Sequence, residues 1–239
     1  MINNQIARFC MTAYEQNLPW PHMVFDNFFS EDVLKACWRE ARAHKYWVSD
    51  DMSGYQDDER TCQVNKFWYP GGAHSLRQMA ATAPTLTTIL QYLNSPEMLL
   101  FLEELTGIDN LIPDDNFEGS GLHKITSGGR LEVHQDYTQH PTNGELYRRI
   151  NLLLYMNPAW KFNGDLELYT DRDTCWKRIS PQFNRAIIFN TTGRSLHGHP
   201  EPLVVPENVS RFSIAMYYFT KERPDDLQEN TAAVWHKKS

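Results

Sequence analysis

Apolar positions in the first half of the chain recur mainly at helical spacing. Ser30 is a suitable N-cap, and Glu31 and Asp32 would place negative charge in the first turn, where it favours the helix dipole. The apolar residues that follow are Val33, Leu34, Cys37, Trp38 and Ala41. This pattern predicts an amphipathic helix that begins just after Ser30.

A second helix is predicted between Ser95 and Gly107. Ser95 can cap it, Pro96 occupies the first helical position, and Gly107 lies where helices commonly end. By contrast, the acidic segment 50–60 has few apolar residues. We expect it to be a solvated loop, with a lid over an active site as the alternative.

From about Asn116 the pattern changes to that of short strands separated by turns. Turn signals occur at Gly128-Gly129, Asn143-Gly144, Asn163-Gly164 and Thr192-Gly193. Between them lie alternating or continuously apolar runs, which are Leu131–Val133, Ile150–Met156, Leu166–Thr170, Ala186–Phe189 and Arg211–Phe219. Such spacing predicts a mainly β fold with flanking helices, as in a sandwich, jelly roll or barrel.

The length of 239 residues is consistent with one domain. We expect a helical N-terminal support region (1–115), a β-rich core (116–220) and a charged tail (221–239) that frays or packs as an appendage. The formal net charge of −7, without a basic stripe, argues against a nucleic-acid partner. No apolar run is long enough to span a membrane and no secretion signal is evident, so we expect a cytoplasmic protein with reduced cysteines.

The residues that indicate chemistry are His134, Asp136 and a histidine far downstream. In a strand, His134 and Asp136 point to the same face, so both can reach one ion. The downstream ligand is either His197 or His199. We favour His197, because Gly198 allows close approach whereas Pro200 turns the chain after His199. Two histidines and one carboxylate form the facial triad of non-haem Fe(II) oxygenases.

An arginine downstream of the triad suggests a second ligand. Arg211 and Ser213 share one face of a predicted strand and can together bind a carboxylate. On a neighbouring strand, Asn151 and Tyr155 share a face, so Asn151 is a further candidate for binding the co-substrate. Tyr155 is either another donor to that carboxylate or a core tyrosine. The sequence contains no GxSxG elbow, no glycine-rich phosphate loop and no HExxH motif that would favour another mechanism.

Several stretches resemble the 2-oxoglutarate/Fe(II)-dependent dioxygenases, and in particular their prolyl-hydroxylase-like branch. They are GGRLEVHQDY (128–137), RRINLLLYMNPAW (148–160), GDLELY (164–169), ISPQFNRAIIFNT (179–191), SLHGHPEPL (195–203) and SRFSIAMYYFT (210–220). The resemblance covers the second half of the chain well and the first half loosely, through PHMVFDNFFSEDVLKAC (21–37).

The resemblance implies a double-stranded β-helix (jelly-roll) core with N-terminal helices packed on it. It also implies that His134, Asp136 and His197 bind iron. Arg211 would bind the distal carboxylate of 2-oxoglutarate with help from Tyr155. The expected activity is hydroxylation of an unactivated C–H with Fe(II), 2-oxoglutarate and O2, releasing succinate and CO2, with ascorbate as a candidate reductant.

The substrate stays open between a prolyl residue in a protein, a free amino acid and another small metabolite. Candidate substrate residues are Tyr137, Arg130, His140 and His199. The rival interpretation is a cupin-like, metal-binding jelly-roll protein that binds or senses without turnover, which would have no need of Arg211. The sequence does not predict an oligomeric state.

Overall fold

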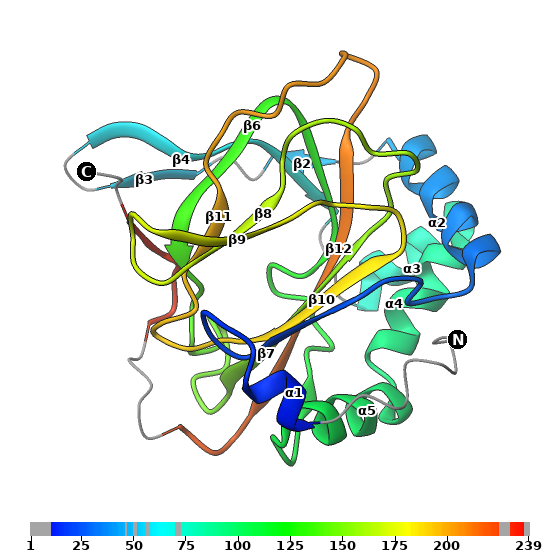
Figure 1. The fold of residues 1–239 in the computed structure, drawn as a ribbon. Coiled ribbons are helices and arrows are strands. Elements are labelled where there is room, and N and C mark those ends of the chain that lie inside the picture. Colours follow the sequence, from blue (N-terminus) through cyan, green and yellow to red (C-terminus); the bar gives the residue numbers. More distant parts are fainter. Residues whose placement is uncertain are drawn as a thin grey trace.

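The computed structural model describes residues 11–45, 47–49, 52–55, 58–69, 73–224 and 230–236, with the side chains of 52–62, 65 and 67–75 left aside. Its strands form one antiparallel sheet that curls into a half-barrel, with helices gathered on one side (Figure 1). No helix among these residues is both long and apolar enough to cross a membrane. The predicted mainly β architecture with flanking helices is therefore confirmed.

The main path of the sheet runs in the order β1-β10-β7-β12-β6-β11-β8-β9, so strands distant in sequence become neighbours. Its strands are β1 (His22–Phe25), β6 (Gly121–Gln135), β7 (Tyr147–Tyr155), β8 (Leu166–Tyr169), β9 (Cys175–Ile179), β10 (Arg185–Asn190), β11 (His197–His199) and β12 (Arg211–Thr220). The long strand β6 is shared, because its first part pairs with β12 and its last part with β11.

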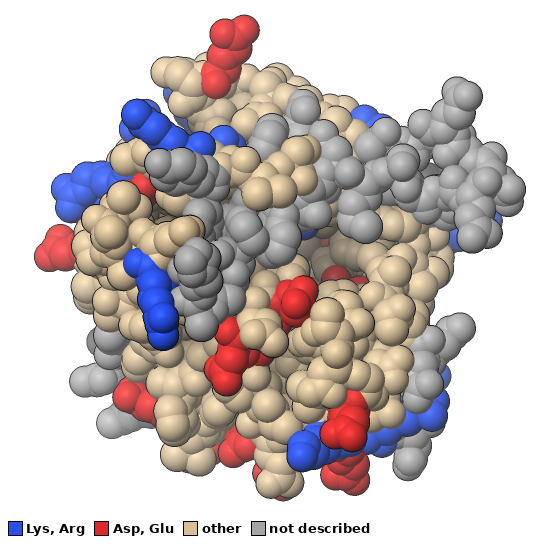
Figure 2. All heavy atoms as spheres, turned by 180° about the vertical axis from the view of Figure 1, so that it is seen from behind, with Lys and Arg blue, Asp and Glu red and all other residues tan. Residues whose placement is uncertain are grey.

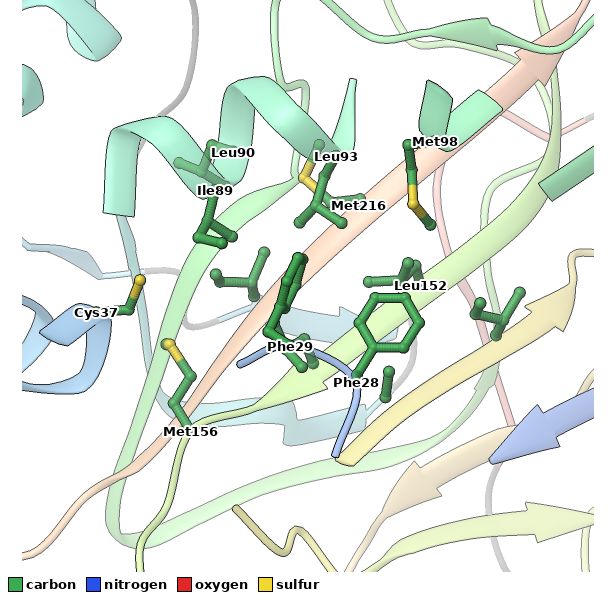
Figure 3. Packing of buried hydrophobic residues seen from close by; sticks show 14 of the residues in the cluster. Phe28, Phe29, Cys37, Ile89, Leu90, Leu93, Met98, Leu152, Met156 and Met216 are labelled. Atoms are coloured by element: carbon green, nitrogen blue, oxygen red, sulfur yellow. The ribbon is translucent and has the colours of Figure 1, made fainter. Parts of the chain in front are cut away.

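The helices pack on the outer face of the sheet. They are α1 (Met11–Glu15), α2 (Glu31–Ala43), α3 (Ala73–Thr82), α4 (Pro84–Leu93) and α5 (Pro96–Thr106). In β7, Leu152 and Leu154 point into the hydrophobic core with the helices, as Ile214 and Met216 do in β12. Figure 3 shows Met216 beside Leu93 of α4 and Leu152 below them, in the same hydrophobic cluster as Ile89 and Leu90.

The two-residue period of β7 and β12 turns the alternate residues toward the interior of the half-barrel. These inward residues, which are Asn151, Leu153, Tyr155, Arg211, Ser213, Ala215 and Tyr217, all line one cavity. Most of these inward residues carry a polar group, which is unusual for a buried face that only packs. The outer face of the sheet therefore provides stability, whereas the inner face is available for chemistry.

The helix predicted between Ser95 and Gly107 is confirmed as α5. The Ser95 hydroxyl accepts a hydrogen bond from the Met98 amide at 3.3 Å, and Gly107 adopts a left-handed φ of 68°. The helix predicted after Ser30 is also confirmed as α2, although the Ser30 side chain makes no capping hydrogen bond.

The N-terminal half contains more strand than predicted. Besides β1, it holds β2 (Val48–Ser49), β3 (Met52–Tyr55), β4 (Asp58–Tyr69) and β5 (Ile112–Pro113). The predicted loop at 50–60 was therefore wrong, since β3 pairs with β4 within it and β4 continues along β6. A hairpin needs backbone hydrogen bonds rather than an apolar face, so its acidic composition concealed it. The lid hypothesis stays a prediction, because residues 50, 51, 56 and 57 lie outside the described ones.

Candidate metal and co-substrate site

The inner face of the curled sheet encloses a cavity of about 300 Å³. Residues from β4, β6, β7, β11 and β12 line it, as do residues near the end of the chain. The face of the molecule turned away in Figure 1 is hollowed near its centre, with acidic side chains beside the opening (Figure 2). A concave, mostly enclosed space with converging polar groups is typical of a ligand site.

Three predicted ligands meet at one end of this cavity. Ligand atoms of His134, Asp136 and His197 all lie within 4.8 Å of one another, and all three residues are buried. His134 and Asp136 lie at the end of β6, and β11 places His197 directly opposite His134 in the register. The Nε2 atoms of the two histidines lie 3.6 Å and 3.5 Å from Asp136 carboxylate oxygens.

Each histidine is oriented by a backbone carbonyl. Nδ1 of His134 lies 2.9 Å from the Glu132 oxygen, and Nδ1 of His197 lies 2.8 Å from the Ser195 oxygen. A proton on Nδ1 leaves the Nε2 lone pair facing the shared point, as is typical of metal-binding histidines. Burial lowers the pKa of His197 to about 4, which favours the neutral form that a metal requires. The donor set therefore fits a divalent iron.

Close approach of β11 to β6 depends on Gly198. A Cβ atom at this position would lie 2.8 Å from the backbone oxygens of Leu131 and Glu132. Backbone atoms of a paired strand cannot move aside without breaking the ladder, so only glycine fits between His197 and His199. This contact supports the sequence argument that Gly198 lets other groups come near.

Asp136 is held by two side chains of β7. The Asn151 amide donates to its carboxylate, and a guanidinium nitrogen of Arg148 lies 3.1 Å from Oδ2. Burial alone would raise the pKa of Asp136, but Arg148, together with His197 and His134, lowers it well below the usual range. Asn151 lines the cavity, and its amide donates to Asp136 while its carbonyl oxygen accepts from Arg148. Co-substrate binding by Asn151 stays a prediction.

Arg211 and Tyr155 form the second predicted cluster. A guanidinium nitrogen of Arg211 donates to the Tyr155 hydroxyl at 2.8 Å, and both residues are buried. The Nε of Arg211 is buried without a hydrogen-bond partner among the described residues. Ser213 lines the same cavity. A buried cation with an unused donor fits a carboxylate, so these residues are suited to hold one end of a keto-diacid.

The four candidate substrate residues separate into two pairs. Tyr137 and His199 line the cavity. Arg130 is not among the lining residues and pairs instead with Glu132 at 3.2 Å. His140 is also outside the lining; its Nδ1 accepts hydrogen bonds from two backbone amides, and its ring packs on Phe219. The geometry therefore does not support substrate contact by Arg130 or His140.

Arg148 is a cavity residue that the sequence analysis missed. It is 1% exposed, and its guanidinium stacks on the rings of Tyr217 and Tyr137 at 3.4 Å and 4.5 Å from their centroids. Its neighbour Arg149 looks equivalent in sequence. The two-residue period of β7, counted back from Asn151, points to Arg149 instead. The register of β7 with β12 shifts at this end of the strand, so no regular pattern in the sequence identifies Arg148.

The C-terminal segment 230–236 packs against β6 and lines the cavity, a role that the sequence analysis did not predict. Strand β13 (Val234–Trp235) pairs with β6 at Gln135 and His134. The Trp235 ring lies 4.9 Å from that of His134, and the Asn230 amide donates to the Asp136 carbonyl at 3.2 Å. Thr231, Ala232, Ala233 and Trp235 line the cavity. We refer to residues 230–236 as the C-terminal strap.

Comparison with known proteins agrees with this geometry. The 2OG-Fe(II) oxygenase superfamily matches residues 120–219, which include both clusters. A curated relative, prolyl 3,4-dihydroxylase OGFOD1 of Ostreococcus tauri, is 25% identical over 86% of this chain. The chain spans 39% of the length of that relative.

Solved structures show the same fold at low identity. A prolyl hydroxylase of Trichoplax adhaerens in complex with a hypoxia-inducible-factor peptide fragment has a TM-score of 0.54 at 15% identity, covering 91% of this chain and 90% of its own. HygX of Streptomyces hygroscopicus with nickel, 2-oxoglutarate and hygromycin B has a TM-score of 0.54 at 13% identity, covering 90% and 92%. The predicted jelly-roll core is thereby confirmed. Residues 120–219 thus match the 2OG-Fe(II) oxygenase superfamily, and the chain is similar to a prolyl dihydroxylase over most of its length.

Proposed function

We propose that the protein is an Fe(II)- and 2-oxoglutarate-dependent hydroxylase that acts on an unactivated C–H and releases succinate and CO2. The observation that carries this proposal is the presence of both required clusters in one cavity. His134, Asp136 and His197 converge at one end, and Arg211 with Tyr155 lines the same enclosure. Iron bound there would supply the oxidising chemistry with O2.

The protein groups have separate tasks in this reaction. The two histidines and Asp136 bind the metal through three positions and leave the others open. Arg148 and Asn151 hold the Asp136 carboxylate in its ionised form and fix its orientation. Arg211 and Tyr155 bind and orient the co-substrate carboxylate. The cavity walls, including Trp235, exclude water from the reacting atoms.

A non-catalytic, metal-binding jelly-roll protein is the alternative function. It would need the triad but not a buried arginine with a free donor. Arg211 is 5% exposed, and its desolvation is costly unless an anion or a strong acceptor compensates. The burial of this cation therefore favours the oxygenase over the binding protein.

The first test of the proposal is anaerobic spectroscopy. Adding Fe(II) and 2-oxoglutarate to the metal-free protein should produce a weak visible charge-transfer band. His134→Ala should abolish the band, because it removes one metal ligand, whereas Arg172→Ala on the surface should leave it unchanged. A wild-type protein that gives no band under these conditions would contradict the proposal.

The substrate class is the finer part of the proposal. Among the proteins similar to this chain are prolyl hydroxylases and an enzyme solved with hygromycin B, so both peptides and small molecules deserve testing. Proline-containing peptides, free amino acids and small metabolites should be screened for stimulated succinate formation in air. If no compound raises the rate of succinate formation above the rate without substrate, the result would favour the alternative function of a binding or sensing protein.

A further inference from the structure

His199 is a buried side chain whose chemistry the proposed reaction has not yet used. It is 3% exposed, and neither of its ring nitrogens has a hydrogen-bond partner within the part of the chain that the structure describes. An imidazole always carries at least one N–H, and its burial without an acceptor loses the hydrogen bond that water provided. Such a residue is expected to be paired by a ligand.

The position of His199 identifies the part of the cavity that it serves. It lies two residues beyond His197 on β11, so both point into the half-barrel, and strand geometry separates them by roughly 6–7 Å. His199 is not a member of the metal-ligating group, which among the described residues consists of His134, Asp136 and His197. It therefore faces the cavity at a distance from the metal position along the strand.

The same cavity contains two other unused donors. Nε of Arg211 and Nε of Arg148 are likewise buried without a partner among the described residues. Of the two, Arg211 is the one grouped with His199, because it is the charged group with the largest electrostatic effect on His199. Tyr155 and Ser213 line this cavity as well. One anionic acceptor would satisfy the unpaired N–H groups of both His199 and Arg211.

We propose that His199 is a further co-substrate-binding residue, which donates a hydrogen bond to the distal carboxylate of 2-oxoglutarate beside Arg211. The proposal rests on the proposed function, because it assumes that this co-substrate enters the cavity. His199 then acts in selecting a diacid over a keto acid that lacks the second carboxylate. The sequence analysis had placed His199 on the substrate side.

The test compares two keto acids on the wild type and three variants, all loaded with Ni(II), which does not support turnover. Binding of 2-oxoglutarate and of 2-oxopentanoate, which lacks the distal carboxylate, is measured by calorimetry. His199→Leu should weaken 2-oxoglutarate binding about 10- to 100-fold, as expected for loss of a hydrogen bond to a charged group. Its affinity for 2-oxopentanoate and for Ni(II) alone should match that of the wild type. Arg211→Met is the positive control.

Thr191→Val is the matched negative control, because the Thr191 hydroxyl is also buried without a partner but is not among the residues lining the cavity. It should bind both keto acids as the wild type does. If leucine prevents folding, His199→Asn, whose shorter amide would not reach the same acceptor, should show the same selective loss.

Two outcomes separate the failure of this inference from failure of the proposed function. Unchanged 2-oxoglutarate affinity in H199L, with a large loss in R211M, would overturn the role of His199 and leave the oxygenase function standing. Equal losses for both keto acids would also overturn it, because they would indicate a general distortion of the cavity. If the nickel-loaded wild type binds no 2-oxoglutarate, the proposed hydroxylase function itself is contradicted.

Discussion

Replacing Arg148 by methionine should strongly destabilise the metal-free protein. Arg148 is almost fully buried, and its guanidinium lies 3.1 Å from Oδ2 of Asp136. Methionine retains much of the stacking volume against Tyr217 and Tyr137 but leaves the carboxylate as a buried charge without its cation. Removing one partner of a buried pair costs about 3–5 kcal/mol, which for a protein of this size corresponds to a fall in Tm of roughly 6–20 °C.

The assay is urea unfolding of the metal-free wild type and of R148M, followed by circular dichroism. Arg172→Met is the control, because Arg172 pairs with Asp173 on the surface and such a pair contributes about 0–1 kcal/mol. The double variant R148M/D136N should recover part of the loss, since it no longer buries an unpaired carboxylate. If R148M loses no more than R172M, the electrostatic reasoning about Asp136 is refuted.

The same pair of proteins gives a pH test with a defined sign. In the wild type the folded pKa of Asp136 lies well below the unfolded value of about 3.9. Its stabilisation is therefore complete above that value and is lost as the pH falls below it. In R148M burial should raise this pKa, so the difference in unfolding free energy between the two proteins should shrink from pH 5 to pH 3. A constant difference would contradict this.

Two further substitutions test the strands around the metal position. Gly198→Ala should lower the free energy of unfolding by about 1–3 kcal/mol and weaken Ni(II) binding, because the added methyl group meets backbone oxygens of β6. Gly193→Ala is the control, since a methyl group there would enter open space. Trp235→Phe should reduce the quenching of tryptophan fluorescence by Co(II), because the Trp235 ring lies 4.9 Å from His134. The exposed Trp176 is the matched control for this measurement, and equal quenching in W235F and W176F would contradict the described position of the C-terminal strap.

The strands that carry the site were predictable because burial imposes a period of two on their sequence. In β7 and β12, Leu152 and Ile214 alternate with Tyr155 and Arg211, and the pattern separates an outer hydrophobic face from an inner polar one. The choice of His197 over His199 as the partner of His134 could be made from their neighbours Gly198 and Pro200, and it is His197 whose ligand atom lies with those of His134 and Asp136.

Other parts were not predictable because their sequences lack a periodic signal. β3 and the start of β4 lie in the segment 50–60, which has few apolar residues, and β13 has only two residues. Asn230 is held by hydrogen bonds with Thr138 and Asp136, and nothing in the residues around it indicates a partner so far away in the chain. Contacts of this kind arise from the three-dimensional arrangement and have no local pattern.

The C-terminal strap has a practical consequence for where the protein can be truncated or fused to another chain. The family match ends at residue 219, before the strap begins. A fragment cut at that boundary would keep the three triad residues and Arg211, yet it would lack the Trp235 side chain in the cavity lining and the Asn230 contact to the Asp136 backbone. Truncations and affinity tags are therefore best placed at the N-terminal end, so that the rim of the cavity is left intact.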